Sequence, residues 1–122
     1  MDRINIKDLP KSLINHGNGL KKVFLQNEDT NTALTQFAWS RFEPGEYCDM
    51  HSHLTMDEYF FVYKGSGTYQ IGNEILNIIE GDFIRIPANI SHKLYVDKKN
   101  QTLELIYFGI DTEFSPENSF TI

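Results

Sequence analysis

Residues 58–86 read EYFFVYKGSGTYQIGNEILNIIEGDFIRI, in which four short runs rich in β-branched and aromatic residues are separated by turn residues. The pair Gly72–Asn73 has the length of a two-residue hairpin turn. Glycine and asparagine suit such turns because they tolerate positive φ or hydrogen-bond their own backbone. The stretch therefore predicts consecutive antiparallel strands.

The rest of the chain continues this pattern in both directions. After Gly19, turn signals recur about every 8–12 residues, which is typical of an all-β sandwich or barrel. Helical signal is confined to Ile6–Asn15, where Pro10 limits it. We expect strands at Lys21–Gln26, Ala33–Phe42, Glu58–Tyr63, Gly67–Ile71, Glu74–Ile79, Phe83–Ile86, His92–Asp97 and Thr102–Ile110.

Some of these strands are apolar on both faces. Alternation in the run 58–63 places Glu58, Phe60 and Val62 on one face and three aromatic residues on the other. The run 103–108 behaves in the same way. A strand of an isolated small barrel has one face in water, so the outer face needs a cover. Either the N-terminal strand or a second copy of the chain covers it, and we expect a homodimer.

The composition excludes several classes of partner. The chain has 122 residues, with 11 lysines and arginines against 17 aspartates and glutamates. Nucleic acids and anionic membranes need a positive face, so neither is an expected partner. No apolar run approaches the ~18–20 residues of a membrane span, and the N-terminus lacks the apolar core of a secretion signal. The one cysteine, Cys48, excludes an internal disulfide, and we expect a cytoplasmic location.

Three of the four histidines have a spacing that suits metal binding. His51 and His53 are two residues apart, so on a strand both imidazoles point to the same face. Glu58 begins the next apolar strand, and His92 begins a later one. Three imidazoles and a carboxylate are a ligand set for a divalent first-row metal. On an octahedral ion they leave two positions open, whereas on zinc they can close the site.

Two segments resemble the conserved motifs of the cupin superfamily. Residues 45–65, GEYCDMHSHLTMDEYFFVYKG, match the spacing of the first motif without a gap. Residues 81–96, GDFIRIPANISHKLYV, match the second motif. This second segment departs from the family pattern twice. Asn89 replaces a glycine, a mild change because asparagine tolerates left-handed backbone, and Val96 replaces a loosely kept asparagine.

The resemblance implies a small antiparallel β-barrel of jelly-roll type, commonly dimeric, with a metal inside one end. We expect one domain over residues 1–122, with the motif-bearing barrel at about 32–110. We expect one divalent transition metal ion, with Fe, Mn, Ni, Co and Zn as the candidates. The family's ligand positions fall on His51, His53, Glu58 and His92.

We expect an enzyme that acts on an organic small molecule. The metal acts as a Lewis acid toward vicinal substrate oxygens, and Glu58 leaves its coordination to serve as general base. This resembles the role proposed for cupin isomerases, and isomerase or lyase-type chemistry on a sugar or other oxygen-rich substrate is the first expectation. The alternatives are an iron(II) dioxygenase and a non-catalytic protein that binds a small ligand.

Several other residues have both a functional and a purely structural interpretation. His16, in the loop HGNG, is either a lid residue or solvated. Cys48 is a reactive thiol near the metal or a small buried apolar side chain. Arg85 points outward or anchors an anion in the pocket. Asp57 is expected to be solvated. The aromatic and apolar pairs Phe37/Trp39 and Tyr69/Ile71 each share a strand face and pack in the core or stack on a flat ligand.

Overall fold

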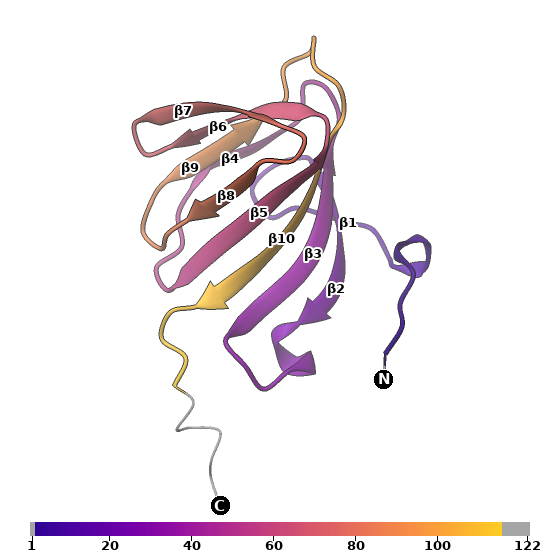
Figure 1. Cartoon of the computed structure of the whole chain (residues 1–122), viewed down its shortest axis with the longest axis vertical. Helices are drawn as coiled ribbons and strands as arrows, with labels where there is room; N and C mark the ends of the chain where they lie inside the picture. The colour runs from indigo at the N-terminus through magenta and orange to yellow at the C-terminus, as the bar shows by residue number, and fades with distance from the viewer. Residues whose placement is uncertain (1, 116–122) are drawn as a thin grey trace, which may run out of the picture.

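A computed structural model of the chain describes residues 2–115 and contains two antiparallel sheets packed face to face (Figure 1). The first sheet has six strands in the order β1-β2-β3-β10-β5-β8, and the second has four in the order β4-β9-β6-β7. The strands are β1 Ser12–Leu13, β2 Leu20–Gln26, β3 Leu34–Phe42, β4 Tyr47–His51, β5 Met56–Lys64, β6 Ser66–Ile71, β7 Glu74–Ile79, β8 Phe83–Ile86, β9 His92–Tyr95 and β10 Leu103–Asp111.

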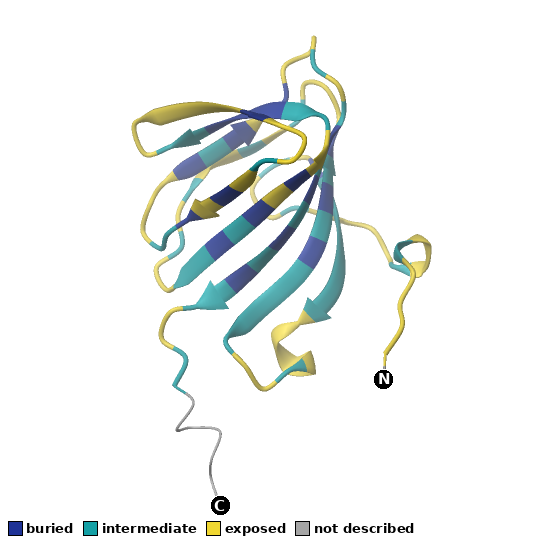
Figure 2. Cartoon of the chain, viewed as in Figure 1, coloured by how far each residue is buried: buried dark blue, intermediate teal, exposed yellow. Residues whose placement is uncertain are grey.

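The core lies between the two sheets. Alternate residues of β5 and β10 are buried and the residues between them are more exposed (Figure 2). Val62, Leu103 and Leu105 from the six-stranded sheet and Leu94 and Ile78 from the other sheet belong to one buried cluster. Burying each such side chain contributes on the order of 1.5–3 kcal/mol. The predicted all-β architecture is therefore confirmed, although the two sheets are not joined into a closed hydrogen-bonded barrel within residues 2–115.

The predicted strands are present, with bounds that shift by at most about two residues. The sequence reasoning missed β4, because its residues YCDMH show no alternation of apolar and polar side chains. The N-terminal segment, expected to be short and either irregular or helical, is mostly irregular. A 3₁₀ helix covers only Ile6–Asp8, and Ser12–Leu13 pairs with β2 as an edge strand.

A second 3₁₀ helix spans Asn27–Asp29, in the turn between β2 and β3. Both helices in the described part of the chain are three residues long. Neither is long or apolar enough to cross a membrane.

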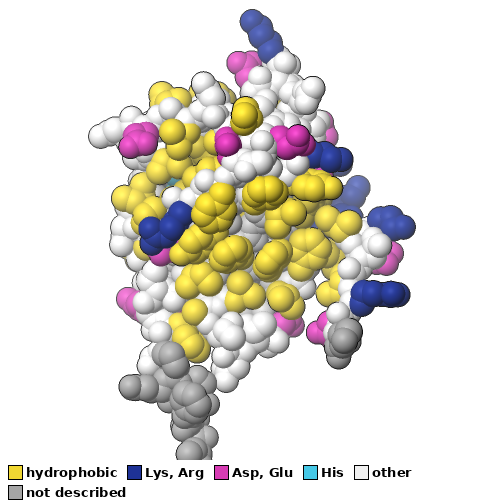
Figure 3. All heavy atoms as spheres, viewed as in Figure 1, with side chains coloured by type: hydrophobic (Ala, Val, Ile, Leu, Met, Phe, Trp, Pro, Cys, Tyr) yellow, Lys and Arg dark blue, Asp and Glu magenta, His cyan; other side chains and the backbone are white. Residues whose placement is uncertain are grey.

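The outer face of the six-stranded sheet carries a row of aromatic rings. From β2 to β8, neighbouring rings lie 4.8–6.2 Å apart between centroids. We call this row the aromatic face. Figure 3 shows it as a broad apolar area open to the viewer. It consists of Phe24, Phe37, Phe108, Tyr59 and Phe83.

The position of the aromatic face bears on two expectations, the role of Phe37 and Trp39 and the cover provided by the N-terminal strand. Phe37 belongs to the aromatic face, and Trp39 lies two residues along the same strand, where its indole nitrogen donates to Glu104 Oε1 (2.9 Å). Neither residue lines the cavity described below. β1 pairs with the edge of β2, so the N-terminal strand does not cover the aromatic face.

Candidate metal centre

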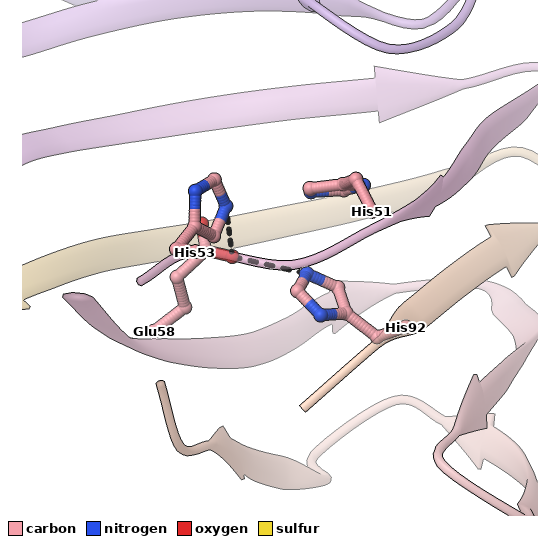
Figure 4. A group of neighbouring side chains, drawn as sticks. All are labelled: His51, His53, Glu58 and His92. Carbon is pink, nitrogen blue, oxygen red and sulfur yellow. Dashed lines mark hydrogen bonds and ion pairs between the residues drawn. The ribbon is translucent and has the colours of Figure 1, made fainter. Parts of the chain in front are cut away.

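Four side chains from both sheets converge at one end of the core. His51 is the last residue of β4, and His53 lies in the loop that follows. Glu58 comes from β5 of the opposite sheet, and His92 is the first residue of β9 and pairs with His51. One ligand atom from each residue lies within 4.8 Å of the others (Figure 4). The four residues that the sequence analysis selected are therefore neighbours in space.

The convergence does not arise as the sequence analysis assumed. Of His51 and His53, only His51 lies on a strand, so strand alternation does not align the two imidazoles. A register shift between Cys48 and His51 in the β4–β9 ladder accompanies the end of β4. The loop then turns His53 back toward Glu58, and His53 Nε2 lies 3.1 Å from Glu58 Oε1.

Backbone carbonyl oxygens orient two of the imidazoles. His51 Nδ1 lies 2.7 Å from the Asp49 oxygen, and His92 Nδ1 lies 2.9 Å from the Ile90 oxygen. A carbonyl only accepts, so each Nδ1 carries a proton, and Nε2 is the ring nitrogen left to face the centre of the cluster. Such a carbonyl bond on the far ring nitrogen is the usual support for histidines that bind metals.

The donor set fits a divalent transition metal on the contacts present. Glu58 Oε1 lies 3.1 Å from His92 Nε2 as well as from His53 Nε2. The His53 nitrogen is buried and lacks the geometry of a hydrogen bond to any described residue. A buried nitrogen that makes no hydrogen bond is costly, and a metal ion bound to its lone pair would satisfy it.

The close packing shifts the pKa values of the cluster. Burial alone raises the pKa of Glu58, but contact with His53 and His92 outweighs it and lowers the value to about 2. Burial lowers the pKa of His51, and the neighbouring imidazoles add to this effect. Contact with the Glu58 carboxylate raises the pKa of His53. Glu58 is thus an anion over the physiological range of pH, as a metal ligand must be.

Two hydrogen bonds connect the loop before His92 to the rest of the centre. The Ala88 N–H donates to Asp57 Oδ1 (2.8 Å), and the Asn89 N–H donates to the His53 oxygen (2.7 Å). Asn89 has a φ of 67°, so the left-handed backbone expected where the family has glycine is confirmed. Asp57 is half-buried and tethered, which corrects the expectation that it is solvated.

Arg85 points away from the cavity. Its Nη2 donates to Asp57 Oδ2 (2.8 Å), and its side chain is 52% exposed. The guanidinium also lies 5.9 Å from the ring centroid of Tyr59 on the outer face. Of the two interpretations of Arg85, the structure therefore supports an outward-facing side chain and not an anion anchor in the pocket.

His16 and Cys48 both reach the cavity. The loop that contains His16 is attached to β4, where the Asn18 N–H donates to the Tyr47 backbone oxygen (3.1 Å). The His16 ring stacks on His51 with centroids 4.4 Å apart, and it remains exposed at the cavity mouth. Cys48 Sγ lies 3.8 Å from His51 Nδ1, and burial, followed by the charges of Glu58 and Asp49, raises the pKa of its thiol to about 12.

The four-residue cluster forms part of the wall of a cavity of about 90 Å³. Apolar side chains line much of the rest, among them Phe60 and Leu94. Tyr69, Ser40 and Tyr107 add hydroxyl groups, and Lys21 adds a cation. Burial raises the pKa of both tyrosines, so they remain neutral hydrogen-bond donors. Lys21, Ser40 and Tyr107 are site residues that sequence reasoning missed.

Comparison with known proteins found one matching family model and a relative with a short region of similarity. A family model described as "Cupin domain" matches residues 38–109, more than half of the chain. An uncharacterized protein of Methanocaldococcus jannaschii is 33% identical over 45 residues. That match spans 37% of this chain and 36% of the relative, so about one third of the relative's length is covered.

Solved structures share the fold at low sequence identity. A predicted oxalate decarboxylase of Thermotoga maritima has a TM-score of 0.82 at 19% identity, covering 90% of this chain and 99% of the other. The polyketide cyclase RemF of Streptomyces resistomycificus has a TM-score of 0.79 at 16% identity, covering 95% and 82%. A variant oxalate decarboxylase of Bacillus subtilis has a TM-score of 0.71 at 22% identity, covering 95% and 30%. Identities this low establish a common fold only.

Proposed function

This chain belongs to the cupin family, and on that premise we propose that it is a metal-dependent enzyme acting on a small, oxygen-rich molecule by isomerase or lyase-type chemistry. The observation that carries the proposal is the convergence of three imidazoles and one carboxylate in the wall of a cavity. His51, His53, Glu58 and His92 would hold the ion. When bound, a divalent transition metal supplies a Lewis acid that polarises a carbonyl or stabilises a developing oxyanion.

Glu58 is the residue we propose as general base. Its contacts with two imidazoles lower its pKa to about 2, which makes it a weak base as it stands. Burial acts in the opposite direction and raises the pKa. A Glu58 carboxylate that turns away from His53 and His92 while staying buried is therefore a stronger base. This switch gives one carboxylate two roles, in binding and in proton transfer.

The phenols of Tyr69 and Tyr107 support acid–base chemistry on an oxygen-rich substrate. Both residues are at least nine-tenths buried and line the cavity. Their raised pKa values keep the phenol protons in place at neutral pH, so both can donate to a substrate oxygen. The named activities of two structural neighbours, a decarboxylase and a cyclase, are of the non-hydrolytic type proposed here.

Metal analysis tests this function most directly. Untagged protein purified without chelators should carry about one transition metal per chain, and His51→Ala and His92→Ala should lose it. His16→Ala is the matched control, because this ring stacks on His51 but lies outside the four-residue cluster. A wild-type chain that folds but cannot be loaded with Fe, Mn, Ni, Co or Zn would overturn the proposal.

Oxygen consumption separates the proposed chemistry from the dioxygenase alternative. Isomerase or lyase-type turnover continues under anaerobic conditions, whereas a dioxygenase stops. Stoichiometric zinc supports the non-redox reaction, because zinc has no accessible redox change. Iron together with substrate-dependent oxygen uptake would replace it with the dioxygenase.

We also propose that the protein is a homodimer joined through the aromatic face. Phe83 of the aromatic face is 62% exposed. Tyr63 and Phe61, which extend the apolar area along the outer side of β5, are 47% and 42% exposed. Large exposed apolar areas on soluble proteins commonly mark interaction surfaces. A second copy offers the same flat row of rings, which suits an isologous contact in which one patch pairs with itself.

A further inference from the structure

We propose that the substrate carries a carboxylate group that pairs with Lys21, while its other oxygen atoms lie at the metal centre. This inference rests on the proposed function and names the class of substrate. It assigns Lys21 as the residue that determines specificity for an anionic ligand.

The strand register places Lys21 on the inner side of β2. Lys21 lies opposite Ser40 of β3, and Val23 lies opposite Ala38. Ser40 and Ala38 are 2% and 0% exposed, so this side of the ladder faces the core. Lys21 therefore points toward the core, and it lines the cavity together with Ser40. It also lines a second, more open groove.

Lys21 has no charged partner within the described residues 2–115. None of the ion pairs found there involves it. Glu58 is the one carboxylate among the residues lining the cavity, and it belongs to the metal cluster. With a divalent ion, Glu58 and Lys21, the formal charge is 2 − 1 + 1 = +2. A cavity of this charge attracts an anion.

Three hydroxyl groups on largely buried residues of the cavity wall have no hydrogen-bond partner within residues 2–115. Ser40, Tyr69 and Tyr107 are 2%, 3% and 7% exposed. Of the hydrogen bonds formed within residues 2–115, none involves these hydroxyls. A hydroxyl that lines a cavity and has no protein partner is available to a ligand, so three such groups in the same cavity wall as Lys21 suit a ligand rich in oxygen atoms.

The volume of the cavity suits a ligand of a few carbon atoms. At about 90 Å³ it is well below the ~300–1,000 Å³ typical of pockets for drug-sized molecules. A carboxylate is the smallest common organic anion that accepts hydrogen bonds from both an ammonium group and hydroxyls. The ligand class is therefore a short organic acid in which one carboxylate pairs with Lys21 and two further oxygen atoms bind the metal.

Two three-carbon hydroxy acids test this inference. Tartronate and lactate share a hydroxyl and a carboxylate that chelate metals, and tartronate has a second carboxylate where lactate has a methyl group. Cobalt-loaded protein is titrated with each acid, and binding is followed by calorimetry and by the visible absorption of Co²⁺. Tartronate should bind the wild-type protein about tenfold or more tightly than lactate, because of the charge-assisted hydrogen bond.

The variants separate Lys21 from general charge effects. Lys21→Met should abolish most of the preference for tartronate, and Lys21→Arg should keep it. Lys22→Met is the matched control, because Lys22 is the next residue on β2 and lies opposite Trp39 on the outer side. Its loss should leave the preference unchanged. Thermal melting of each variant shows whether the fold is intact.

The outcomes distinguish this inference from the proposed function. If each variant binds one cobalt ion but Lys21→Met keeps the wild-type preference, or if wild-type protein binds neither acid, the assignment of Lys21 is overturned and the metal centre stands. If wild-type protein binds no cobalt, the proposed function fails and this inference fails with it.

Discussion

Asp57 Oδ1 accepts a hydrogen bond of 2.8 Å from the backbone N–H of Ala88, four residues before His92. This bond connects β5, which carries Glu58, to the loop that leads into β9. Two members of the metal cluster are thus held in position by a residue that does not belong to it. Asp57 is a positioning residue, and its effect is separable from its exposed ion pair with Arg85.

Asp57→Ala should weaken metal binding by about tenfold, in the range seen when outer partners of metal ligands are removed. The Ala88 N–H loses its acceptor, and the loop before His92 is released. Arg85→Ala is the control, because it removes the exposed ion pair and leaves the Ala88 bond intact. Competition with a metal indicator measures both affinities. Equal losses in the two variants would contradict a role for the loop tether.

The same residue gives a prediction for stability against pH. The Ala88 N–H, with Arg85, lowers the pKa of Asp57 from its ordinary value of 3.8. A depressed folded-state pKa contributes stability above the unfolded-state pKa, and this contribution is lost as pH falls through the folded-state value. The difference in unfolding free energy between wild-type protein and Asp57→Asn should therefore be constant from neutral pH to about 5 and shrink below about 4. Chemical denaturation across this range measures it, and a gap that widens on acidification would contradict the assignment.

Metal affinity should fall as the solution is made acidic. Each imidazole binds metal only when its ring nitrogen is unprotonated, and ordinary histidines protonate near pH ~6.5. The pKa of His53 is raised and that of His51 is lowered, so proton competition begins at His53 and reaches His51 at lower pH. The slope of log affinity against pH should therefore steepen below about pH 6. Calorimetric titration between pH 5.5 and 8 checks this, and a flat profile would argue against histidine ligation.

Alanine substitutions at two glycines with positive φ distinguish the cost of backbone strain from the cost of a steric clash. Gly65 has a φ of 81°, and a β-carbon there would collide with the Thr102 carbonyl oxygen. Gly81 has a φ of 94° and has open space around the same position. Gly81→Ala should cost about 1–3 kcal/mol for the strained backbone alone. Gly65→Ala should cost more, and urea denaturation of both variants gives the difference. Equal costs would mean that the strands around Gly65 adjust freely.

The proposed dimer should dissociate when a charge enters the aromatic face. Phe83→Asp places a carboxylate against aromatic rings, and its desolvation disfavours association. Ile75→Asp is the control, because Ile75 is 66% exposed on β7 of the other sheet. Sedimentation should show a dimer for the wild-type protein and Ile75→Asp, and a monomer for Phe83→Asp. A monomeric wild-type protein would rule out the dimer.

The fold was predictable from sequence where local signals were strong. The hairpin at Gly72–Asn73 is present, and β7 and β8 have the predicted bounds, because turn residues mark their ends. β4 carried no such signal, since its side chains are mostly exposed and its pairing with β9 is a long-range contact. Contacts between distant segments leave little trace in local patterns.

The residues of the cavity were likewise predictable only in part. Motif spacing selected His51 and His92, but nothing in the sequence singled out Lys21. Both faces of the six-stranded sheet are apolar, so alternation along β2 cannot show whether Lys21 or Lys22 points inward. The pairing of Lys21 with Ser40 resolves this question, and only the assembled sheet provides it.

The origin of the cluster in both sheets has a consequence for when the protein acquires its metal. His92 pairs with His51 only after β9 has formed, and β5, with Glu58, lies between β8 and β10, the last strand of the described chain. During synthesis the cluster therefore remains incomplete until β9 has left the ribosome, and β5 lacks one neighbour until β10 follows. Metal selection is then a property of the finished fold, made from the ions available where folding ends.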